Sequence, residues 1–544
     1  MKKNAEQSQR VPIITAQVAI VLLTLLWVQL AAPSSATGSV SAQPQLLDKI
    51  PTEYSEASGT TANCRYGVTV GPGETQIIPQ IGAGAFYWFT SPYWPGPIPD
   101  NDAEVVHLIK TFQKKSGSMY LPEYTTNVPL DSALGDYIRN NPGDVWIVGN
   151  EVDRGPNPGQ VTGGQGDMWP EMYAEAYHDI YYFIKSYDYS ARVVNSGLVQ
   201  VTPGRLQYLD KVWNAYRAKY GSVMPVDAWS MHVYILPEVH ADGITPNGIA
   251  NVALRTDPAI GKRESANDAQ ACSDPDVYCF AEHDDMSVFS EQVVAMRQWM
   301  KQHGQQQKPL MLTEYSILYP HEIDEDSCWL QDEFGNCFTP DRVSTFMVNS
   351  FNYLDGARDS SLGYALDDSR LVQDWFWFGV YPERVGDVSG LVKSDLSTLT
   401  LVGETYRDYV NAEPVSMNLI VERVPDATAT TWEDNTATAK LSVRFRNNGN
   451  TAVNSPFNVT FYQDAAHTEP IGSATISPLV RGCALSSYVA SVTWSGLTPG
   501  AHQFWVAVDS SNVIDESSPD KADNFGTGYV RVHKYGSLLP VIRL

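Results

Sequence analysis

Two glutamates stand at the carboxyl ends of short apolar segments. Glu151 follows DVWIVGN (144–150), and Glu314 lies near the end of KPLMLTEYS (308–316). A protonated carboxyl group beside an ionised one can donate a proton to a leaving oxygen while the other attacks an anomeric carbon. Cleavage of a glycosidic bond requires these two actions. The amide of Asn150, next to Glu151, could bind a neighbouring sugar hydroxyl. The residue types therefore indicate paired-carboxylate chemistry on a sugar.

Such a pair works only if the fold brings the two segments together, so the elements around them matter. The predicted strands are near-continuous apolar runs, typical of strands buried on both faces of a parallel sheet. They are GAFYWFT (84–90), EVVHLIKTF (104–112), DVWIVGN (144–150), ARVVNSG (191–197), DAWSMHVY (227–234), KPLMLTEYS (308–316) and SLGYALDD (361–368). Amphipathic helical segments alternate with them at 172–188, 205–220, 287–304 and 342–356.

This alternation predicts an α/β chain whose residues 66–412 form a (β/α)₈ TIM barrel. A doubly wound open sheet is the alternative, but no Gly-rich phosphate-binding motif follows an early strand. In a barrel, the carboxyl ends of the strands converge at one face, and active-site loops lie there. The long segments 236–286 and 316–341 are expected to be such loops.

Three short motifs together resemble the clan-A retaining glycoside hydrolases. GNEVD (149–153) is similar to that clan's Asn-Glu motif on strand four, WSMHVY (229–234) to its strand-six His-x-Tyr, and LTEYS (312–316) to its strand-seven nucleophile motif. The resemblance covers roughly residues 66–410. It implies a retaining two-glutamate mechanism that needs no metal or organic cofactor. This sequence has Val152 where the family usually has proline, and its early barrel is compact.

The resemblance also implies roles for individual residues. Glu151 would be the acid/base and Glu314 the nucleophile, with Asn150 binding the sugar 2-hydroxyl. His232 and Tyr234 would support the nucleophile, and Trp375 or Trp377 would form the aromatic floor of the subsite nearest the cleaved bond. Trp88 is a further candidate for stacking on a sugar ring, together with Trp94, Trp146 and Trp169, although tryptophans near strands are more often core residues.

Structural interpretations of the same residues stand beside the catalytic one. An Asn-Glu pair at a strand end is often a helix cap or a turn, and His232 could be a core histidine. Asp153 and Arg154 could form a local ion pair. If the barrel is degenerate, the protein would be a non-catalytic cell-surface glycan-binding or adhesion protein. The two readings differ in whether both glutamates face one open cleft.

Other chemistries lack their motifs. The Gly-x-Ser-x-Gly nucleophile elbow and HExxH are absent from the sequence. The acidic runs EHDD (282–285) and HEIDED (321–326) could bind Ca²⁺, but solvated surface is the favoured interpretation. The formal charge of −25 argues against a nucleic-acid partner and against docking on anionic lipid. A low charged fraction of 18% with 11% aromatic residues suits a polar but mostly uncharged ligand such as a sugar.

From residue 413 onward the composition changes to Thr, Val, Asn and Ser with period-two alternation, which predicts an all-β immunoglobulin-like sandwich over 413–544. The segment LSVRFRNNGNTAVNSPFNVTFY (441–462), with the acidic segment that follows Val508, resembles a CARDB-type module. That resemblance implies a cell-surface or glycan contact. Asp509, Asp515, Glu516 and Asp520 could bind Ca²⁺, although a polar loop is the favoured interpretation.

The amino-terminal segment predicts export. Basic residues precede the apolar stretch 18–32 and a small-residue exit, so residues 1–42 are expected to be a signal peptide, or a signal anchor if uncleaved, followed by a linker at 43–65. The protein would be secreted or held at the cell surface, touching a membrane only through this segment. In an oxidising compartment, Cys272/Cys279 and Cys328/Cys337 predict short-range disulfides. For Cys64 and Cys483, pairing and free thiols both stay open.

Overall fold

The computed structural model describes most of the chain from residue 62 onward. The described residues are 62–156, 165–248, 250–319, 328, 330–382, 387–429, 431–433, 436–477, 479–518 and 521–533. The predicted signal segment, most of the predicted linker and HEIDED (321–326) lie outside them.

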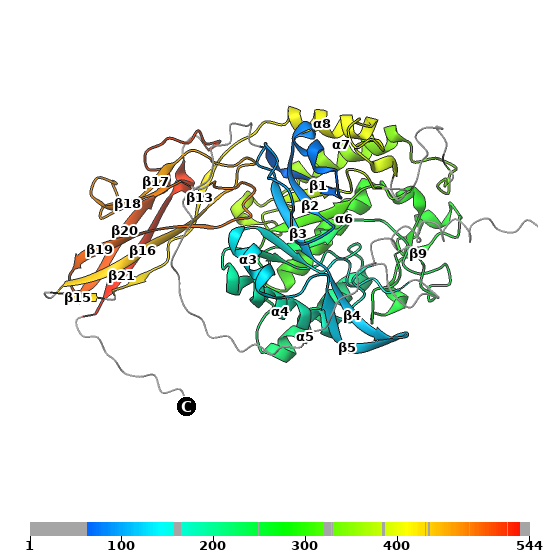
Figure 1. The fold of residues 1–544 in the computed structure, drawn as a ribbon, viewed down its shortest axis with the longest axis horizontal. Helices are drawn as coiled ribbons and strands as arrows, with labels where there is room; N and C mark the ends of the chain where they lie inside the picture. The colour runs from blue at the N-terminus through cyan, green and yellow to red at the C-terminus, as the bar shows by residue number, and fades with distance from the viewer. Residues whose placement is uncertain are drawn as a thin grey trace, which may run out of the picture.

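Eight parallel strands form the barrel predicted from the sequence (Figure 1). In chain order they are β1 (Asn63–Val70), β2 (Ala83–Trp88), β3 (Glu104–Ile109), β6 (Val145–Val148), β7 (Arg192–Val194), β8 (Trp229–His232), β11 (Leu310–Tyr315) and β12 (Asp374–Trp377). Their order in the sheet is β7-β6-β3-β2-β1-β12-β11-β8. A parallel bridge between Val194 and Ala228 links the two end strands. The sheet is therefore nearly closed, as a (β/α)₈ barrel requires.

Helices of the outer layer connect most of these strands. They are α2 (Ile78–Ile81), α3 (Ser132–Asn140), α4 (Pro170–Tyr187), α5 (Pro203–Tyr220), α6 (Met286–Gln302), α7 (Pro340–Gly356) and α8 (Leu401–Ala412). The early barrel is compact, as expected, because α2 is a single turn and the described residues 89–103 between β2 and β3 form no helix. A hairpin of β4 (Thr111–Ser116) and β5 (Met119–Thr126) follows β3 directly.

Two expectations about strands were wrong. The segment 361–368 is a turn with a short 3-10 helix (Ala365–Asp367), because the chain reverses through left-handed residues at Asp368 and Ser369. The eighth strand is β12, which therefore contains Trp375 and Trp377. The first strand, β1, begins at Asn63, three residues before the predicted start of the barrel at residue 66.

Side chains alternate between two cores along each strand, since successive strand residues point to opposite faces. On β2, Phe86 belongs to the layer between the sheet and the helices, whereas Ala85 and Tyr87 belong to the barrel interior. On β3, Val106 and Leu108 also face the interior. This alternation decides which residues can reach the mouth of the barrel.

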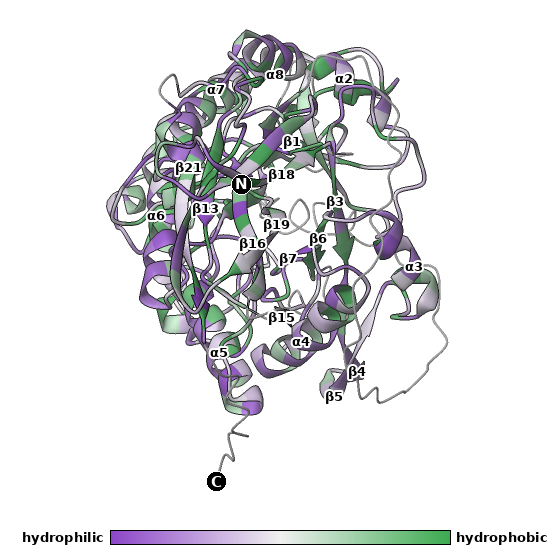
Figure 2. Cartoon of the chain, turned by 90° about the vertical axis from the view of Figure 1, so that its left-hand side faces the viewer, coloured by the Kyte–Doolittle hydropathy of each residue, from purple (hydrophilic) through white to green (hydrophobic). Residues whose placement is uncertain are grey.

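The carboxyl-terminal domain is a sandwich of two sheets, as predicted. One sheet contains β13 (Leu419–Arg423), β15 (Thr431–Glu433), β16 (Thr436–Asn447) and β19 (Tyr488–Leu497); the other contains β14 (Ala427–Thr428), β17 (Phe457–Tyr462), β18 (Pro470–Ile476), β20 (Gly500–Ala507) and β21 (Phe525–Val532). Figure 2, viewed from the sandwich side, shows its strands in front of one end of the ring of barrel helices.

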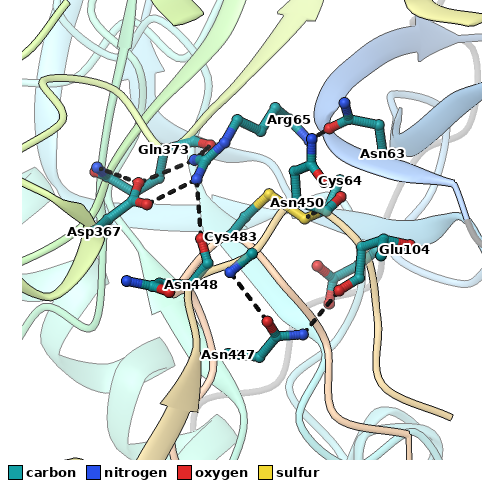
Figure 3. The surroundings of a disulfide bond; sticks show 12 residues. Asn63, Cys64, Arg65, Glu104, Asp367, Gln373, Asn447, Asn448, Asn450 and Cys483 are labelled. Carbon is teal, nitrogen blue, oxygen red and sulfur yellow. Dashed lines mark hydrogen bonds and ion pairs between the residues drawn. A yellow bond between two sulfur atoms is a disulfide. The ribbon is translucent and has the colours of Figure 1, made fainter. Parts of the chain in front are cut away.

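The sandwich seals the floor of the barrel. Cys483 and Leu485, from the loop before β19, pack into the same core cluster as the interior residues of the barrel strands. A disulfide joins Cys483 to Cys64 at the start of β1 (Figure 3). The backbone N–H of Cys64 also donates to the carbonyl of Asn450 at 2.9 Å. The amino ends of the strands are thus closed by a loop of the other domain.

Buried ion pairs surround this contact. Arg65 pairs with Asp367 at 2.7 Å and donates to the carbonyl of Asn448 in the sandwich at 3.3 Å (Figure 3). Glu104 accepts from the guanidinium of Arg192 and lies 3.4 Å from that of Arg481. The Arg65 guanidinium therefore has acceptors in both domains, and Arg481 of the sandwich approaches a barrel carboxylate that is already paired with Arg192.

All six cysteines are paired. Cys272–Cys279 and Cys328–Cys337 form the short-range disulfides predicted from the sequence, and Cys64–Cys483 settles the question left open there. Three disulfides are typical of an oxidising environment. Within the described part of the chain, no helix has the length and apolar character needed to cross a bilayer.

Removal of the interdomain disulfide is expected to lower stability more than removal of a short one. Cys64 and Cys483 are 419 residues apart, whereas Cys272 and Cys279 are 7 apart. Closing the longer loop restricts the unfolded chain by about 3 kcal/mol more. Cys64→Ser/Cys483→Ser should therefore lower the calorimetric Tm more than the matched control, Cys272→Ser/Cys279→Ser. An equal decrease in both variants would contradict the structural role of the interdomain bond.

Candidate active site

The carboxyl ends of three barrel strands bring together two glutamates and a histidine. Glu151 follows β6, the fourth strand; His232 ends β8, the sixth; Glu314 lies in β11, the seventh. His232 Nδ1 is 3.3 Å from Glu151 Oε1 and 3.7 Å from Glu314 Oε2. One ligand atom from each of the three residues lies within 4.8 Å of the others, and all three side chains are buried. Strands far apart in the sequence thus converge on one polar cluster.

The backbone at Glu151 has an uncommon conformation. β6 ends at Val148, and the chain turns through Gly149, with φ +84°, to Glu151, with φ +43°. A left-handed φ is unfavourable for a non-glycine residue, so the surrounding structure must hold it. The N–H of Glu151 donates to the carbonyl of Gly197, after β7, at 3.1 Å. The turn and this hydrogen bond direct the carboxyl group of Glu151 toward His232.

A buried arginine supports the loop behind Glu151. Arg205, on α5, is fully buried and lies 2.6 Å from Asp153 and 2.9 Å from Glu238. Its guanidinium also donates to the carbonyls of Ala250 and Asn251. Asp153 therefore pairs with Arg205. Sequence proximity had suggested a local pair with the adjacent Arg154. This network joins the loop after β6, which carries Glu151, to the loop that follows His232 at the end of β8.

The surroundings shift the pKa values of the two glutamates in opposite directions. Burial and the nearby charge of Glu151 raise the pKa of Glu314 from 4.5 to about 7. Burial acts the same way on Glu151, but the hydrogen bond and charge of His232 bring its pKa below the usual value. Although burial opposes its charge, the two carboxylates raise the pKa of His232. As the pH rises through about 7, the pair therefore loses the proton held by Glu314, because two close carboxylates resist ionising together.

Two further predicted residues lie beside this cluster. The hydroxyl of Tyr234 donates to Glu314 Oε2 at 3.3 Å, and the amide of Asn150 donates to Gln165 Oε1 at 2.9 Å. Several buried polar atoms near them have no hydrogen-bond partner among the described residues: Asn150 Oδ1, Glu314 Oε1, His232 Nε2 and Tyr87 Oη. Such atoms are costly without partners, so a polar ligand at this position would be stabilised.

The structure does not bring the predicted tryptophans to this cluster. Trp88, Trp375 and Trp377 face the layer between the sheet and the helices, where they are at most 5% exposed. Trp375 packs edge-on against Tyr66, and Trp377 against Tyr315. The prediction that Trp88, Trp375 and Trp377 contact sugar assigned these side chains to the wrong face of their strands, because successive residues of a strand point to opposite faces.

The same alternation reveals residues that the motifs missed. Tyr87, on β2, faces the interior, and the charges of Glu314 and Glu151 both act on its hydroxyl. Phe89 and Lys110 each come one residue after a strand ends, β2 and β3 respectively. Phe89 packs next to the interior core, and the charge of Glu314 acts on Lys110. Phe378 follows β12, two residues beyond the inward-facing Phe376, and is half-buried. Counting by two from the interior residues would have found them.

Other acidic groups are occupied by protein partners. In EHDD (282–285), Glu282 accepts from the N–H of Cys279, Asp284 pairs with Arg342, and Asp285 caps α6. In the sandwich, Asp509 and Glu516 both bind the ammonium of Lys521. Asp509 and Glu516 are buried, so the expectation of a solvated polar loop is wrong for these two residues. Among the described residues, a divalent ion could be held by Glu151, His232 and Glu314; the other group of ligand atoms includes the disulfide-bonded Cys272 and Cys279.

Comparison with known proteins assigns the second domain. Residues 416–525 match the CARDB family model. The sandwich is a CARDB domain. A structure of the CARDB domain of a Pyrococcus furiosus protein, in complex with di-metal ions, has 19% identity and a TM-score of 0.17, covering 22% of this chain and 98% of that one. The CARDB prediction made from the sequence is thus confirmed.

Structures similar to the larger part of the chain include two glycoside hydrolases. A GH128 (subgroup II) endo-β-1,3-glucanase from Pseudomonas viridiflava has 13% identity and a TM-score of 0.37, covering 64% of this chain and 97% of that one. A family 51 α-L-arabinofuranosidase from Bifidobacterium longum has 10% identity and a TM-score of 0.32, covering 82% and 98%. No curated protein matches the sequence. With TM-scores below 0.5, these likenesses add nothing to the geometry of the site.

Neutralising Glu314 is expected to stabilise the protein at alkaline pH. Its folded pKa of about 7 lies above the unfolded value of 4.5, so the folded state loses stability as the pH rises through 7. A difference of this size corresponds to on the order of 3 kcal/mol. Glu314→Gln should therefore have a larger free energy of urea unfolding than the wild type at pH 8, with little difference at pH 4. Glu151→Gln, the matched control, should lose stability at pH 8.

Gly197 is expected to be required for the position of His232. A Cβ at Gly197 would lie 2.3 Å from His232 Nε2, inside the buried cluster. Gly197→Ala should therefore displace the imidazole and lower the free energy of unfolding by about 1–3 kcal/mol. The control is Gly356→Ala at the end of α7, where a Cβ meets no atom within 4 Å. Equal stability of both variants in urea unfolding would contradict this packing constraint.

Proposed function

We propose that the protein is an exported glycoside hydrolase that cleaves O-glycosidic bonds in an oligo- or polysaccharide. The observation that carries the proposal is the pair Glu151 and Glu314, which lie at the mouth of a (β/α)₈ barrel with carboxylate oxygens within 4.8 Å. Retaining enzymes have carboxyl groups about 5–5.5 Å apart, whereas inverting ones leave room for water at about 6.5–9.5 Å. The 4.8 Å is an upper bound between one oxygen of each carboxylate. It is compatible with a retaining double displacement, which the strand-four and strand-seven motifs favour.

In this mechanism one glutamate protonates the leaving oxygen while the other attacks the anomeric carbon and forms a glycosyl-enzyme. Water then hydrolyses that intermediate, with the first glutamate acting as base. We assign the acid/base role to Glu151 and the nucleophile role to Glu314, following the strand-four and strand-seven motifs. Asn150 would bind a sugar hydroxyl through its unpaired Oδ1, and His232 and Tyr234 would orient the carboxylates.

The location of the proton in the free protein does not decide which glutamate is the acid/base and which is the nucleophile. In the free protein, burial favours the proton on Glu314, whose pKa is about 7, whereas the proposed acid is Glu151. Because the carboxyl groups share one proton, their titration belongs to the pair. The role of each depends on which face of the bound sugar it meets. The reaction of the two variants with azide, described below, separates the assignments.

Export rests on separate observations. Three disulfides suit an oxidising compartment, and the amino-terminal sequence has the composition of a signal peptide. We therefore place the proposed activity outside the cytoplasm, with the protein secreted or attached to the cell surface. Because the CARDB domain seals the barrel floor, a glycan or cell-surface contact through it would add to this structural role.

Removal of either carboxyl group is expected to abolish turnover. Glu151→Ala should lower kcat on a polysaccharide by about 10²–10⁴-fold, but less on a 2,4-dinitrophenyl glycoside, whose leaving group needs no proton. Azide should rescue this variant and give a glycosyl azide of retained configuration. Azide added to Glu314→Ala should give the inverted anomer, because it replaces the nucleophile. NMR identifies the anomers.

The matched control is Glu123→Gln, which removes an exposed carboxylate paired with Lys114. This variant should hydrolyse the substrates at the wild-type rate. Wild-type rates in either site variant would refute the proposal, and an exchange of the two azide products would reverse the roles of Glu151 and Glu314. Glycan binding by the wild type without turnover would favour the alternative of a non-catalytic glycan-binding protein.

A further inference from the structure

Lys110 presents a cation beside the proposed catalytic pair. It follows Ile109, the last residue of β3, and alternation with the inward-facing Val106 and Leu108 places it on the interior side. Its Nζ lies 4.2 Å from the centroid of the Phe89 ring. The charges of Lys110 and Glu314 each act on the titration of the other. The ammonium therefore lies at the mouth of the barrel, near Glu314.

No described carboxylate forms an ion pair with this ammonium. Lys114 and Lys115, on the adjacent hairpin, pair with Glu123 and Asp167 respectively, whereas the Lys110 ammonium lies over the aromatic face of Phe89. Burial lowers the pKa of Lys110 to about 8, although the charge of Glu314 acts in the opposite direction. A half-buried cation of this kind is stabilised by an anionic ligand group.

The neighbouring atoms suit the remainder of a sugar. Asn150 Oδ1 can accept a hydrogen bond from a hydroxyl, and the Tyr87 hydroxyl can donate or accept one; both are buried without partners among the described residues. A neutral sugar could satisfy these atoms but would leave the ammonium without a counter-charge. The site thus offers hydroxyl recognition together with one positive charge.

We propose that the sugar bound beside Glu314 carries an anionic group and that Lys110 receives it, so that the substrate is an acidic glycan. The group would be the carboxylate of a uronic acid or a sulfate ester, since both present anionic oxygens to an ammonium. The inference rests on the proposed glycoside hydrolase activity and narrows its substrate class.

The net charge of the protein makes a local cation necessary for such a substrate. The whole chain carries a formal charge of −25, which repels a polyanion at long range. At physiological ionic strength the Debye length is about 8 Å, so distant charges are largely screened. Over a few ångströms, beside buried carboxylates, one ammonium acts more strongly than many screened surface carboxylates.

The test compares each acidic polysaccharide with its own neutral form. Polyuronates are assayed beside their carboxyl-reduced products, and sulfated polysaccharides beside their desulfated products, so that linkages stay constant. The wild type should cleave at least one acidic polymer about 10- to 100-fold faster than its neutral form, in kcat/KM. Lys110→Met should lose that factor on the acidic polymer, so that its ratio of kcat/KM for the acidic polymer to kcat/KM for the neutral polymer falls to about one.

Two further variants control for folding and for surface charge. Lys110→Arg keeps the charge and should retain most of the preference for the acidic polymer, whereas Lys114→Met removes an exposed lysine and should change nothing. Comparison of the polyuronates with the sulfated polysaccharides identifies which anionic group Lys110 binds. Equal rates on acidic and neutral forms, or equal losses on both in Lys110→Met, would overturn the inference while leaving the hydrolase proposal intact. No cleavage of any polymer would overturn both.

Discussion

The imidazole of His232 between two buried carboxylates is the interaction on which the site depends. Glu151 and Glu314 lie too close together to ionise independently, and both are removed from water. His232 contacts both carboxylates, and its charge favours the ionised forms. The left-handed turn at Glu151 and the Arg205 network hold the loop of Glu151, and the space at Gly197 accommodates His232. The surrounding structure thus maintains a costly arrangement of charge.

The two ends of the barrel have different tasks. At the carboxyl end, unpaired polar atoms gather around the glutamates. At the amino end, Cys483 and Leu485 of the CARDB domain pack into the interior, and the buried Arg65 donates to acceptors in both domains. The second domain is therefore a part of the barrel core, and a description of it as a separate spacer misses this role. Packing at the amino ends of the strands contributes free energy that offsets the cost of the buried charges at the carboxyl ends.

Much of this could be predicted from residue patterns, because burial on both faces leaves continuous apolar runs. The segments 84–90, 144–150 and 308–316 all contain barrel strands, and the motifs around Glu151, His232 and Glu314 lie on the fourth, sixth and seventh strands. Prediction failed where a local pattern had two meanings. SLGYALDD resembles a strand in composition but is a turn, and its Asp367 serves as the partner of Arg65.

By itself, the sequence determined the strand–helix rhythm, the CARDB domain, the short-range disulfides and the candidate pair of glutamates, because these depend on local composition and spacing. Only the tertiary structure decided which side chains face the interior, so that Tyr87 and Lys110 lie near the pair while Trp88, Trp375 and Trp377 pack outside. It also decided that Cys64 pairs with Cys483 across 419 residues. The direction of each side chain and the pairing of distant cysteines follow from the closure of the sheet. Closure brings distant segments together, and no single segment encodes it.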